Sequence, residues 1–260
     1  ISRGVSQLFG IDLAENFRRP YFSRNISEYW HRWHITLGAW LREYLFYPIA
    51  MSKLFQKFGR SLKKHFGMKI SKVLPVSIAS LITFIVVGIW HGAYWRYVGF
   101  GLWNGLIIMV STLLEDKYAV WKKTLHIRDT NKLFILFQMF RTFLIVLVGY
   151  YFDIAPGFTA ALKMMWLSIT DFHISELADP AIFDALGVSS ASLILVAIAV
   201  LALLVCSIVQ ECSGRTLREM ICSKGFWAEA GVFLLLFWVV AIFGVYGPGT
   251  NPAEFVYMQF

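Results

Sequence analysis

The sequence predicts an all-α fold, a polytopic membrane helical bundle, and three observations lead to this prediction. Of the 260 residues, 58% are hydrophobic and only 15% are charged, whereas soluble domains usually carry about 25% charged residues. Several apolar runs are each about 20 residues long, which is the length of helix that crosses a bilayer. The connections between these runs alternate in their content of Lys and Arg, as expected for a chain that crosses a membrane repeatedly.

The first part of the chain, residues 1–25, is expected to form loops with short helical pieces. The segment 26–50 differs, because its apolar residues recur every three or four positions, the spacing of an amphipathic helix. These residues are Trp30, Trp33, Leu37, Trp40, Leu41 and Tyr44. Arg32, Arg42 and Glu43 interrupt the apolar face. We therefore expect an interfacial or re-entrant helix rather than a spanning one.

Residues 51–72, here called the basic segment, contain many cations and no acidic residue. The cations are Lys53, Lys57, Arg60, Lys63, Lys64, Lys69 and Lys72. We expect a cytoplasmic loop that is attracted to anionic lipid headgroups. The membrane spans that follow are expected at residues 73–92, 97–114, 133–152, 191–210 and 227–246.

The charges of the connections predict how the chain is oriented. With the basic segment in the cytoplasm, the connections 115–132 and 211–226 also lie in the cytoplasm, and both are rich in Lys and Arg. The connection 153–190 has Lys163 as its one Lys or Arg residue, so we expect it outside. Together these segments predict a single membrane-embedded unit over residues 1–260, the C-terminal part of a longer chain.

The overall charge and the cysteines exclude several classes of protein. The net charge is +8, but the basic residues flank apolar runs instead of gathering on one soluble face. This pattern favours membrane lipids as partners and argues against nucleic acid. The three cysteines, Cys206, Cys212 and Cys222, contain no CxxC pair, so neither a disulfide framework nor a zinc knuckle is indicated.

His91 is the leading candidate for a catalytic residue. It directly follows the apolar run that ends at Trp90, and Gly92 follows it. Ionisable residues at membrane depth are costly to keep there and usually have a function. A neutral imidazole in an apolar pocket is available as a general base for an alcohol that attacks a thioester. The structural alternative is a core histidine that is hydrogen-bonded to a neighbouring helix.

A second histidine, His34, lies in the tryptophan-rich segment. On one continuous helix it would share a face with His31 and Trp30, at spacings of three and four residues. Two histidines at this spacing can bind zinc, but no third ligand lies nearby in the sequence, so we expect no metal. The structural alternative is a histidine that anchors an amphipathic helix at the membrane interface.

Two polar residues within the expected spans are further candidates for substrate contact. Arg141 lies near the middle of its span, where a cation needs a partner or an aqueous cavity. Asn104 lies between Gly101 and Gly105. Their structural alternatives are a bond from Arg141 to a carboxylate or to backbone carbonyls, and an interhelical hydrogen bond from Asn104.

Several ordered motifs resemble those of the membrane-bound O-acyltransferase (MBOAT) family, in particular its bacterial alginate O-acetyltransferase branch. The motifs are Asn16-Phe17-Arg18-Arg19-Pro20-Tyr21, Trp30-His31-Arg32-Trp33-His34-Ile35-Thr36-Leu37, Trp40-Leu41-Arg42-Glu43-Tyr44-Leu45, Gly88-Ile89-Trp90-His91-Gly92-Ala93 and Glu254-Phe255-Val256-Tyr257-Met258-Gln259-Phe260. The resemblance is strongest over residues 10–105 and implies a helical bundle around a central tunnel.

The resemblance also implies a function and a site. His91 matches the catalytic histidine of the family and His34 matches its second tunnel histidine. Trp30, Trp33 and Trp90 would line the tunnel. The implied enzyme lies in the plasma membrane of a bacterium and contains no bound cofactor. It takes an acyl group from a cytoplasmic thioester, with acetyl-CoA as the expected donor.

The implied acceptor is a hydroxyl on the opposite side of the membrane, on a polysaccharide or on a secreted SGNH-type acetyltransferase or esterase that relays the acyl group. Three alternatives remain open from the sequence. A sister branch transfers D-alanine from a carrier protein to teichoic acid. A transporter or flippase would use the intramembrane polar residues as a substrate path. A structural membrane scaffold would use none of them chemically.

Overall fold

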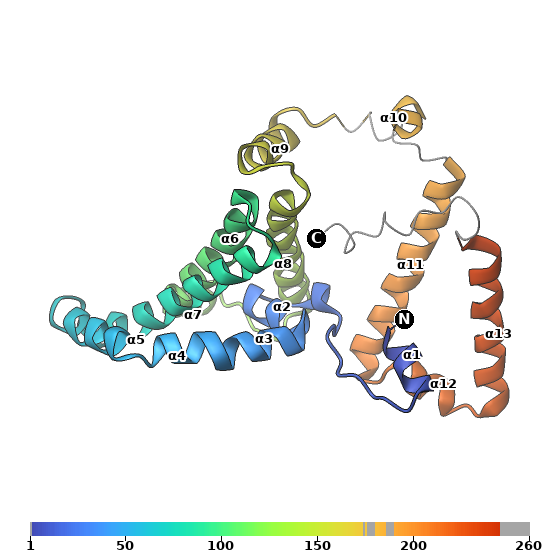
Figure 1. The fold of residues 1–260 in the computed structure, drawn as a ribbon, viewed down its shortest axis with the longest axis horizontal. Helices are drawn as coiled ribbons and strands as arrows, with labels where there is room; N and C mark the ends of the chain where they lie inside the picture. The colour runs from blue at the N-terminus through green and yellow to red at the C-terminus, as the bar shows by residue number, and fades with distance from the viewer. Residues whose placement is uncertain (1, 174, 176–179, 186–189, 245–260) are drawn as a thin grey trace. The chain divides into compact units, whose positions relative to one another are not determined.

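The computed structural model describes residues 2–173, 175, 180–185 and 190–244 (Figure 1). All regular elements in these ranges are helical, and the strand-type pairing within them is an isolated antiparallel bridge between Phe17 and Trp33. The chain forms two compact units, Ile1–Phe172 and His173–Phe260. A single catalytic unit over the whole chain stays a prediction. The aromatic motif at residues 254–260 lies outside the described residues.

The first unit contains most of the elements. In order they are α1 (Ser2–Leu8), the 3₁₀-helix η1 (Pro20–Phe22), α2 (Ile26–Arg32), α3 (Ile35–Leu41), the π-helix η2 (Arg42–Phe46), α4 (Tyr47–Ala50), α5 (Lys53–His91), α6 (Trp95–Leu113), α7 (Glu115–Thr124), α8 (Lys132–Ile154) and α9 (Phe158–Thr170). The second unit contains α10 (Pro180–Ala185), α11 (Ser190–Ser213), α12 (Leu217–Cys222) and α13 (Phe226–Phe243).

The all-α polytopic membrane fold that the sequence predicts is confirmed. Four helices in the described part of the chain, α5, α8, α11 and α13, are long and apolar enough to cross a membrane. A fifth span results if α6 and α7, which meet at an angle of 59°, are counted as one. The expected spans coincide with the second half of α5, with α6, α8 and α11, and with α13 up to its end at Phe243.

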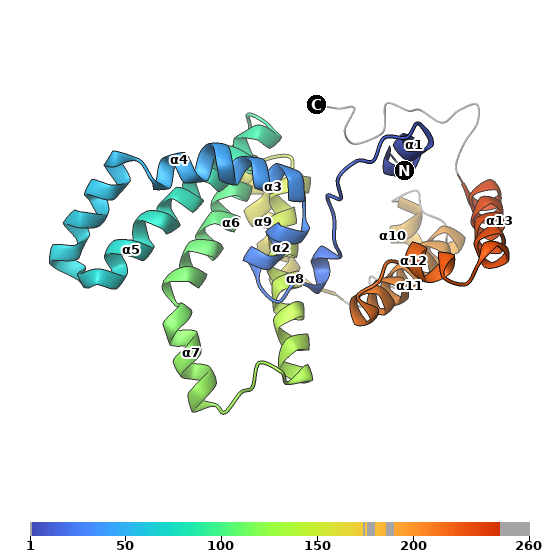
Figure 2. The same cartoon turned by 90° about the horizontal axis from the view of Figure 1, so that it is seen from below.

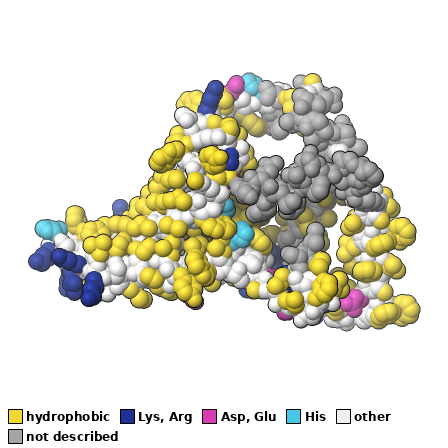
Figure 3. All heavy atoms as spheres, viewed as in Figure 1, with side chains coloured by type: hydrophobic (Ala, Val, Ile, Leu, Met, Phe, Trp, Pro, Cys, Tyr) yellow, Lys and Arg dark blue, Asp and Glu magenta, His cyan; other side chains and the backbone are white. Residues whose placement is uncertain are grey.

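The basic segment is helical, where the sequence led us to expect a loop. Helix α5 contains a break at Gly67, whose φ is 80°, and the chain reverses there (Figure 2). The two arms, 53–66 and 68–91, pack closely, since a Cβ on Gly59 would lie 2.8 Å from the carbonyl oxygen of Ser71. Lys and Arg are good helix formers. Their charges gather at the end of this hairpin (Figure 3), and its cytoplasmic location stays a prediction.

Helices α5 and α6 cross with their backbones almost in contact. A Cβ on Gly88 would lie 2.1 Å from the carbonyl oxygen of Tyr97, and a Cβ on Gly101 would lie 2.3 Å from that of Phe84. A Cβ on Gly105 would lie 2.7 Å from the side-chain Cδ1 of Leu81. Small residues allow this approach between membrane helices, where packing replaces the hydrophobic effect as the driving force. The crossing fixes the end of α5, which carries His91.

Segment 26–50 is not the continuous helix that the sequence led us to expect, because it breaks between α2 and α3. His34 lies at the break in the left-handed region, with φ 49° and ψ 53°. The extended segment around Phe17 runs beside the break. The amide of Arg18 donates to the carbonyl of Arg32 (2.9 Å), and the amide of Ile35 donates to the carbonyl of Asn16 (3.1 Å). This pairing between chain segments replaces helical hydrogen bonds and turns the backbone.

The side chain of Asn16 completes the turn. Its Oδ1 accepts hydrogen bonds from the amide of Thr36 (3.0 Å) and from Thr36 Oγ1 (2.6 Å). His34 makes no side-chain cap hydrogen bond at this position. Asn16 thus satisfies amides at the start of α3 that otherwise have no helical partner. The left-handed backbone of His34 is held by these bonds.

Replacing Gly101 with alanine is expected to destabilise the α5–α6 crossing. The added Cβ meets backbone atoms, which cannot move aside as a side chain can, so the loss is about 1–3 kcal/mol. Thermal unfolding of the purified protein in detergent, followed by circular dichroism, measures it. Gly231 in α13 has nothing within 4 Å of an added Cβ, so Gly231→Ala is the control. A Gly101→Ala protein as stable as the Gly231→Ala protein would contradict the proposed contact.

Replacing Asn16 with alanine is expected to loosen the start of α3, because a lost cap costs about 0.5–2 kcal/mol. Hydrogen–deuterium exchange of a peptide that covers residues 34–38 should speed up in Asn16→Ala and stay near wild type in Asn16→Asp, which keeps the acceptor oxygen. Asn131 caps α8 through the amide of Leu133 (2.9 Å), so Asn131→Ala serves as the matched control. Faster exchange at residues 34–38 in the control variant would show that the effect is not local.

Candidate active site

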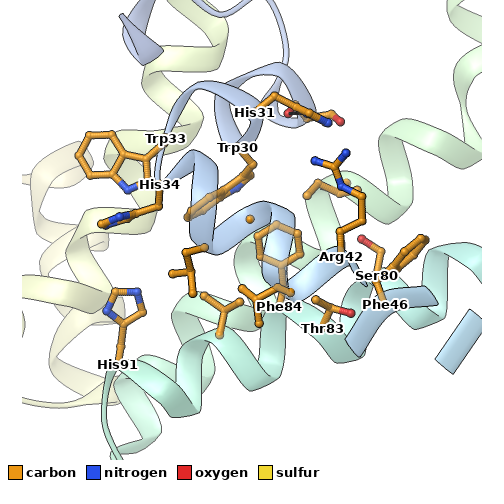
Figure 4. Close-up of a pocket in the computed structure, with 16 residues that line it drawn as sticks. Trp30, His31, Trp33, His34, Arg42, Phe46, Ser80, Thr83, Phe84 and His91 are labelled. Atoms are coloured by element: carbon orange, nitrogen blue, oxygen red, sulfur yellow. Dashed lines mark hydrogen bonds between the residues drawn. The ribbon is translucent and has the colours of Figure 1, made fainter. Parts of the chain in front are cut away.

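A cavity of about 320 Å³ lies between α5 and the short helices of segment 26–50 (Figure 4). Helix α5 contributes one stripe of its surface, made by Ser80, Thr83, Phe84, Val87 and His91. Successive residues of this set are one, three or four positions apart, so they lie along one face of the helix. The eleven helical steps from Ser80 to His91 correspond to a rise of about 16 Å. The cavity is therefore elongated along α5.

The two candidate histidines lie at the same end of this cavity. Figure 4 shows His34 and His91 there, on different elements, one at the α2–α3 break and the other at the end of α5. Both line the cavity. The ring of His91 lies among aromatic rings, with centroids 5.6 Å from Phe100 and 6.2 Å from Tyr97. The fold therefore brings together two imidazoles that are 57 positions apart in the sequence.

The ring of His34 packs against two neighbouring aromatic rings. Its ring centroid lies 4.8 Å from that of Phe17 and 5.7 Å from that of Trp33. Burial lowers the pKa of His34 below its ordinary value, and the nearby His91 lowers it further. His34 is therefore a neutral imidazole at neutral pH, able to donate one hydrogen bond through one ring nitrogen and to accept one through the other.

His31 lines the cavity but does not share a helix face with His34, so the sequence-based reason for that pairing is wrong. Helix α2 ends at Arg32, before His34. The Nδ1 atom of His31 instead makes a hydrogen bond with the carbonyl of Ser27 (2.7 Å). Among the residues that the structure describes, no group of three or more His, Cys, Asp or Glu side chains could hold a metal ion.

The three candidate tryptophans divide into two sets. Trp30 and Trp33 line the cavity, and their place in a tunnel stays a prediction. Trp90 does not belong to the lining and is 61% exposed. Neighbouring residues on a helix point about 100° apart, so the turn that directs His91 into the cavity directs Trp90 away from it.

Asn104 positions the site rather than lining it. It is buried in α6, and its Oδ1 accepts a hydrogen bond from Nε1 of Trp30 (3.3 Å). Its Nδ2 donates to the carbonyl of Phe100 one turn earlier (2.9 Å). This arrangement is the interhelical hydrogen bond that the sequence offered as the alternative to substrate contact. It fixes the indole that forms one wall of the cavity.

Arg141 lies outside this cavity. Its Nη2 donates to the backbone carbonyl of Arg24 (2.9 Å), so it ties α8 to the chain just before α2. The side chain borders a separate hollow, which is lined by Trp103, Phe137, Phe140, Leu144, Ile145 and Val148. The bond to a backbone carbonyl is the structural alternative that the sequence offered for this residue.

Sequence reasoning missed four polar residues of the cavity, Ser27, Arg42, Ser80 and Thr83. Arg42 was noted only as an interruption of an apolar helix face. That interruption was the signal, because a cation within an otherwise apolar stripe needs a polar surrounding or a ligand. Ser80 and Thr83 give no comparable signal, since small hydroxyl residues are common in membrane helices.

The lowered pKa of His34 predicts how stability depends on pH. In the unfolded chain a histidine has a pKa of about 6.5, so below this pH the unfolded state binds a proton before the folded state does. The contribution of the neutral His34 to the free energy of unfolding is thus fully present above about pH 6.5 and is lost as the pH falls below that value. Melting temperatures between pH 7 and 5 should fall less in His34→Gln than in wild type. Equal falls would contradict the burial of a neutral His34.

No family model matches the chain, but individual proteins do. It is 29% identical to the probable alginate O-acetylase AlgI of Azotobacter vinelandii over 199 residues, which are 76% of this chain and 34% of that protein. It is 28% identical to the teichoic acid D-alanyltransferase of Bacillus subtilis over 148 residues, 57% of this chain and 34% of that protein. It is 34% identical to the peptidoglycan O-acetyltransferase of Helicobacter pylori over 107 residues, which are 41% of this chain and 17% of that protein.

The matched segment spans about a third of the length of the first two of these relatives. The alginate O-acetylase and the D-alanyltransferase are both members of one family of membrane enzymes. The helices of this chain are long and apolar enough for a multi-pass membrane protein, as in those relatives. The chain is therefore homologous to enzymes of the membrane-bound O-acyltransferase family.

Proposed function

We propose that this chain carries the reaction centre of a membrane O-acyltransferase. It moves an acyl group, specifically an acetyl group, from a cytoplasmic thioester to a hydroxyl outside the plasma membrane of a bacterium. The donor is acetyl-CoA, and the acceptor is a polysaccharide or a secreted SGNH-type partner that relays the acyl group. The observation that carries this proposal is the meeting of His34 and His91 at one end of an elongated, largely apolar cavity.

The chemistry needs one base and one binding site for the thioester. A ring nitrogen of His91 takes the proton of the acceptor hydroxyl, whose oxygen forms a bond to the carbonyl carbon of the thioester. The tetrahedral intermediate collapses, the carbon–sulfur bond breaks, and the leaving sulfur takes the proton back from the imidazolium. The products are an ester and a thiol, and His91 returns to its neutral form. His34 orients the donor or acceptor by a hydrogen bond from its neutral ring.

The remaining lining of the cavity suits this reaction. Leu37, Phe84, Val87 and Ile108 give the cavity an apolar surface. Such a surface favours an acyl chain over water, and exclusion of water limits hydrolysis of the thioester. Phe100 and Tyr97 beside His91 also restrict the space in which its imidazole moves.

Transfer of D-alanine to teichoic acid is the second candidate, because one group of relatives has that name. It uses the same histidine chemistry on a thioester, so the two candidates differ in the acyl group, the acceptor and the source of the donor. Assays of membranes with acetyl and D-alanyl thioesters separate them directly. A transporter, by contrast, would retain its activity without a general base.

Replacing His91 with alanine is expected to reduce acyl transfer by about 10²- to 10⁴-fold, the usual contribution of a general base. The O-acetyl content of the cell surface, divided by the amount of inserted protein, measures the effect. His65 is an exposed histidine in the basic segment and does not line the cavity. His65→Ala is therefore the matched control and should behave as wild type. Acetylation by His91→Ala at the wild-type rate would refute the proposed function.

A further inference from the structure

The imidazole of His91 lacks the hydrogen bond that usually orients a general base. In well-understood enzymes a third group, such as a carboxylate, holds the base in place. Within the described ranges of the chain, neither ring nitrogen of His91 forms a hydrogen bond with a protein atom. Its neighbours are instead the aromatic rings of Trp90, Tyr97 and Phe100. The orientation of the imidazole therefore comes from packing against these rings.

Tyr97 is the neighbour whose place is most firmly fixed. It belongs to the first turn of α6 and is only 2% exposed. Its ring lies nearly parallel to that of His91, with centroids 6.2 Å apart and an angle of 28° between the planes. The ring also fills the space beside Gly92, since a Cβ there would lie 2.6 Å from Cε2 of Tyr97. Tyr97 thus borders the imidazole and the turn that follows it, and it does not line the cavity.

Arg96 in turn holds Tyr97. Its Nη2 donates to the hydroxyl of Tyr97 (2.9 Å), and its guanidinium carbon lies 4.6 Å from the centre of the same ring. Its Nη1 donates to the carbonyl of Ala155 (2.6 Å), a fully buried residue in the connection between α8 and α9. Hydrogen bonds from a charged donor are stronger than neutral ones, and a cation is attracted to the face of an aromatic ring. Arg96 and Tyr97 therefore join this buried connection to the surroundings of His91.

We propose that Tyr97, held by Arg96 on the carbonyl of Ala155, is the positioning residue that sets the orientation of the His91 imidazole. This inference rests on the proposed acyl transfer and identifies what replaces the orienting hydrogen bond. A general base acts only when its nitrogen lies within hydrogen-bond reach of the proton that it removes. A displacement of about 1 Å can cost about 10²-fold in rate. Because Tyr97 does not line the cavity, its loss affects kcat rather than the binding of the donor.

The test removes the ring and the hydroxyl of Tyr97 separately. The full-length enzyme in native membranes is assayed with labelled acetyl-CoA at varied concentration, for transfer to the cell-surface acceptor. Tyr97→Leu is expected to lower kcat by about 10- to 100-fold and to leave the KM for acetyl-CoA within about twofold of wild type. Tyr97→Phe keeps the ring and should recover most of the loss. A wild-type kcat in Tyr97→Leu, or an equal loss in Tyr97→Phe, would overturn the assignment.

A double-mutant cycle tests the part played by Arg96. Arg96→Met loses the cation and both hydrogen bonds while keeping an unbranched side chain, so kcat should fall by about 3- to 10-fold. In the Tyr97→Leu background the same change should have little further effect, because Arg96 acts on His91 through the Tyr97 ring. Two losses that simply multiply would show that Arg96 acts independently of Tyr97 and would refute this link.

Tyr94 supplies the matched control. It lies 5.7 Å from the guanidinium carbon of Arg96, but it is 68% exposed and its ring neighbour is Tyr97, not His91. Tyr94→Leu should therefore keep the wild-type kcat, and a loss equal to that of Tyr97→Leu would count against a specific role of Tyr97. Thermal melting in detergent shows whether Tyr97→Leu is folded. If it is not, Tyr97→Met carries the same comparison, because the flexible side chain of methionine fills irregular space.

Chemical modification distinguishes this inference from the proposed function. Diethyl pyrocarbonate modifies neutral imidazoles, and mass spectrometry follows its reaction with His91 without any acyl transfer. His91 should react several-fold faster in Tyr97→Leu than in wild type or Tyr97→Phe, relative to the exposed His65. This pattern in a protein that transfers no acyl group would refute the function and leave the positioning role standing. Acyl transfer at the same rate in wild type and Tyr97→Leu would refute the positioning role alone.

Discussion

The close crossing of α5 and α6 is the contact on which the rest of the first unit depends. In a bilayer, apolar side chains gain little by leaving lipid for another helix, so close packing of backbones has to hold the helices together. Gly88 and Gly101 permit that approach because any side chain there would overlap a carbonyl oxygen of the facing helix. The crossing fixes the last turns of α5, which form one wall of the cavity and end at His91. It also fixes α6, whose Asn104 holds the indole of Trp30 in the opposite wall.

The second requirement is the interruption of segment 26–50. A continuous amphipathic helix would place Trp30 and His34 on one face, whereas the break at His34 turns the chain between α2 and α3 and keeps both residues in the lining of the cavity. Pairing with the segment around Asn16 and Phe17 supplies the hydrogen bonds that the broken helix lacks. The left-handed conformation of His34 is unfavourable for a residue with a side chain, and these bonds compensate for it. A strained residue thus lies in the place where the proposed chemistry needs a fixed imidazole.

The cavity that results has two different ends. The imidazoles of His34 and His91 lie at one end, the guanidinium of Arg42 lies toward the other, and Phe84 lies between them. This separation matches the needs of a group-transfer enzyme, in which recognition of the donor and chemistry on its acyl group take place at different points. Binding energy gained far from the reacting bond can orient the thioester for attack. The relatives that the chain resembles are enzymes named for acyl transfer of this kind, which agrees with such a division.

The sequence by itself determined the helical spans and the membrane character and singled out His91 and His34 as candidates, because these follow from local composition, periodicity and motifs. It did not determine the reversal at Gly67, the break at His34 or the outward position of Trp90. It left the partners of Asn104 and Arg141 undecided. Those features depend on pairings between distant segments, such as Asn16 with Thr36, 20 residues apart, and Arg24 with Arg141, 117 residues apart. Local patterns carry no information about which distant carbonyl or glycine a given residue will contact. Only the tertiary structure therefore decided which polar residues share the cavity.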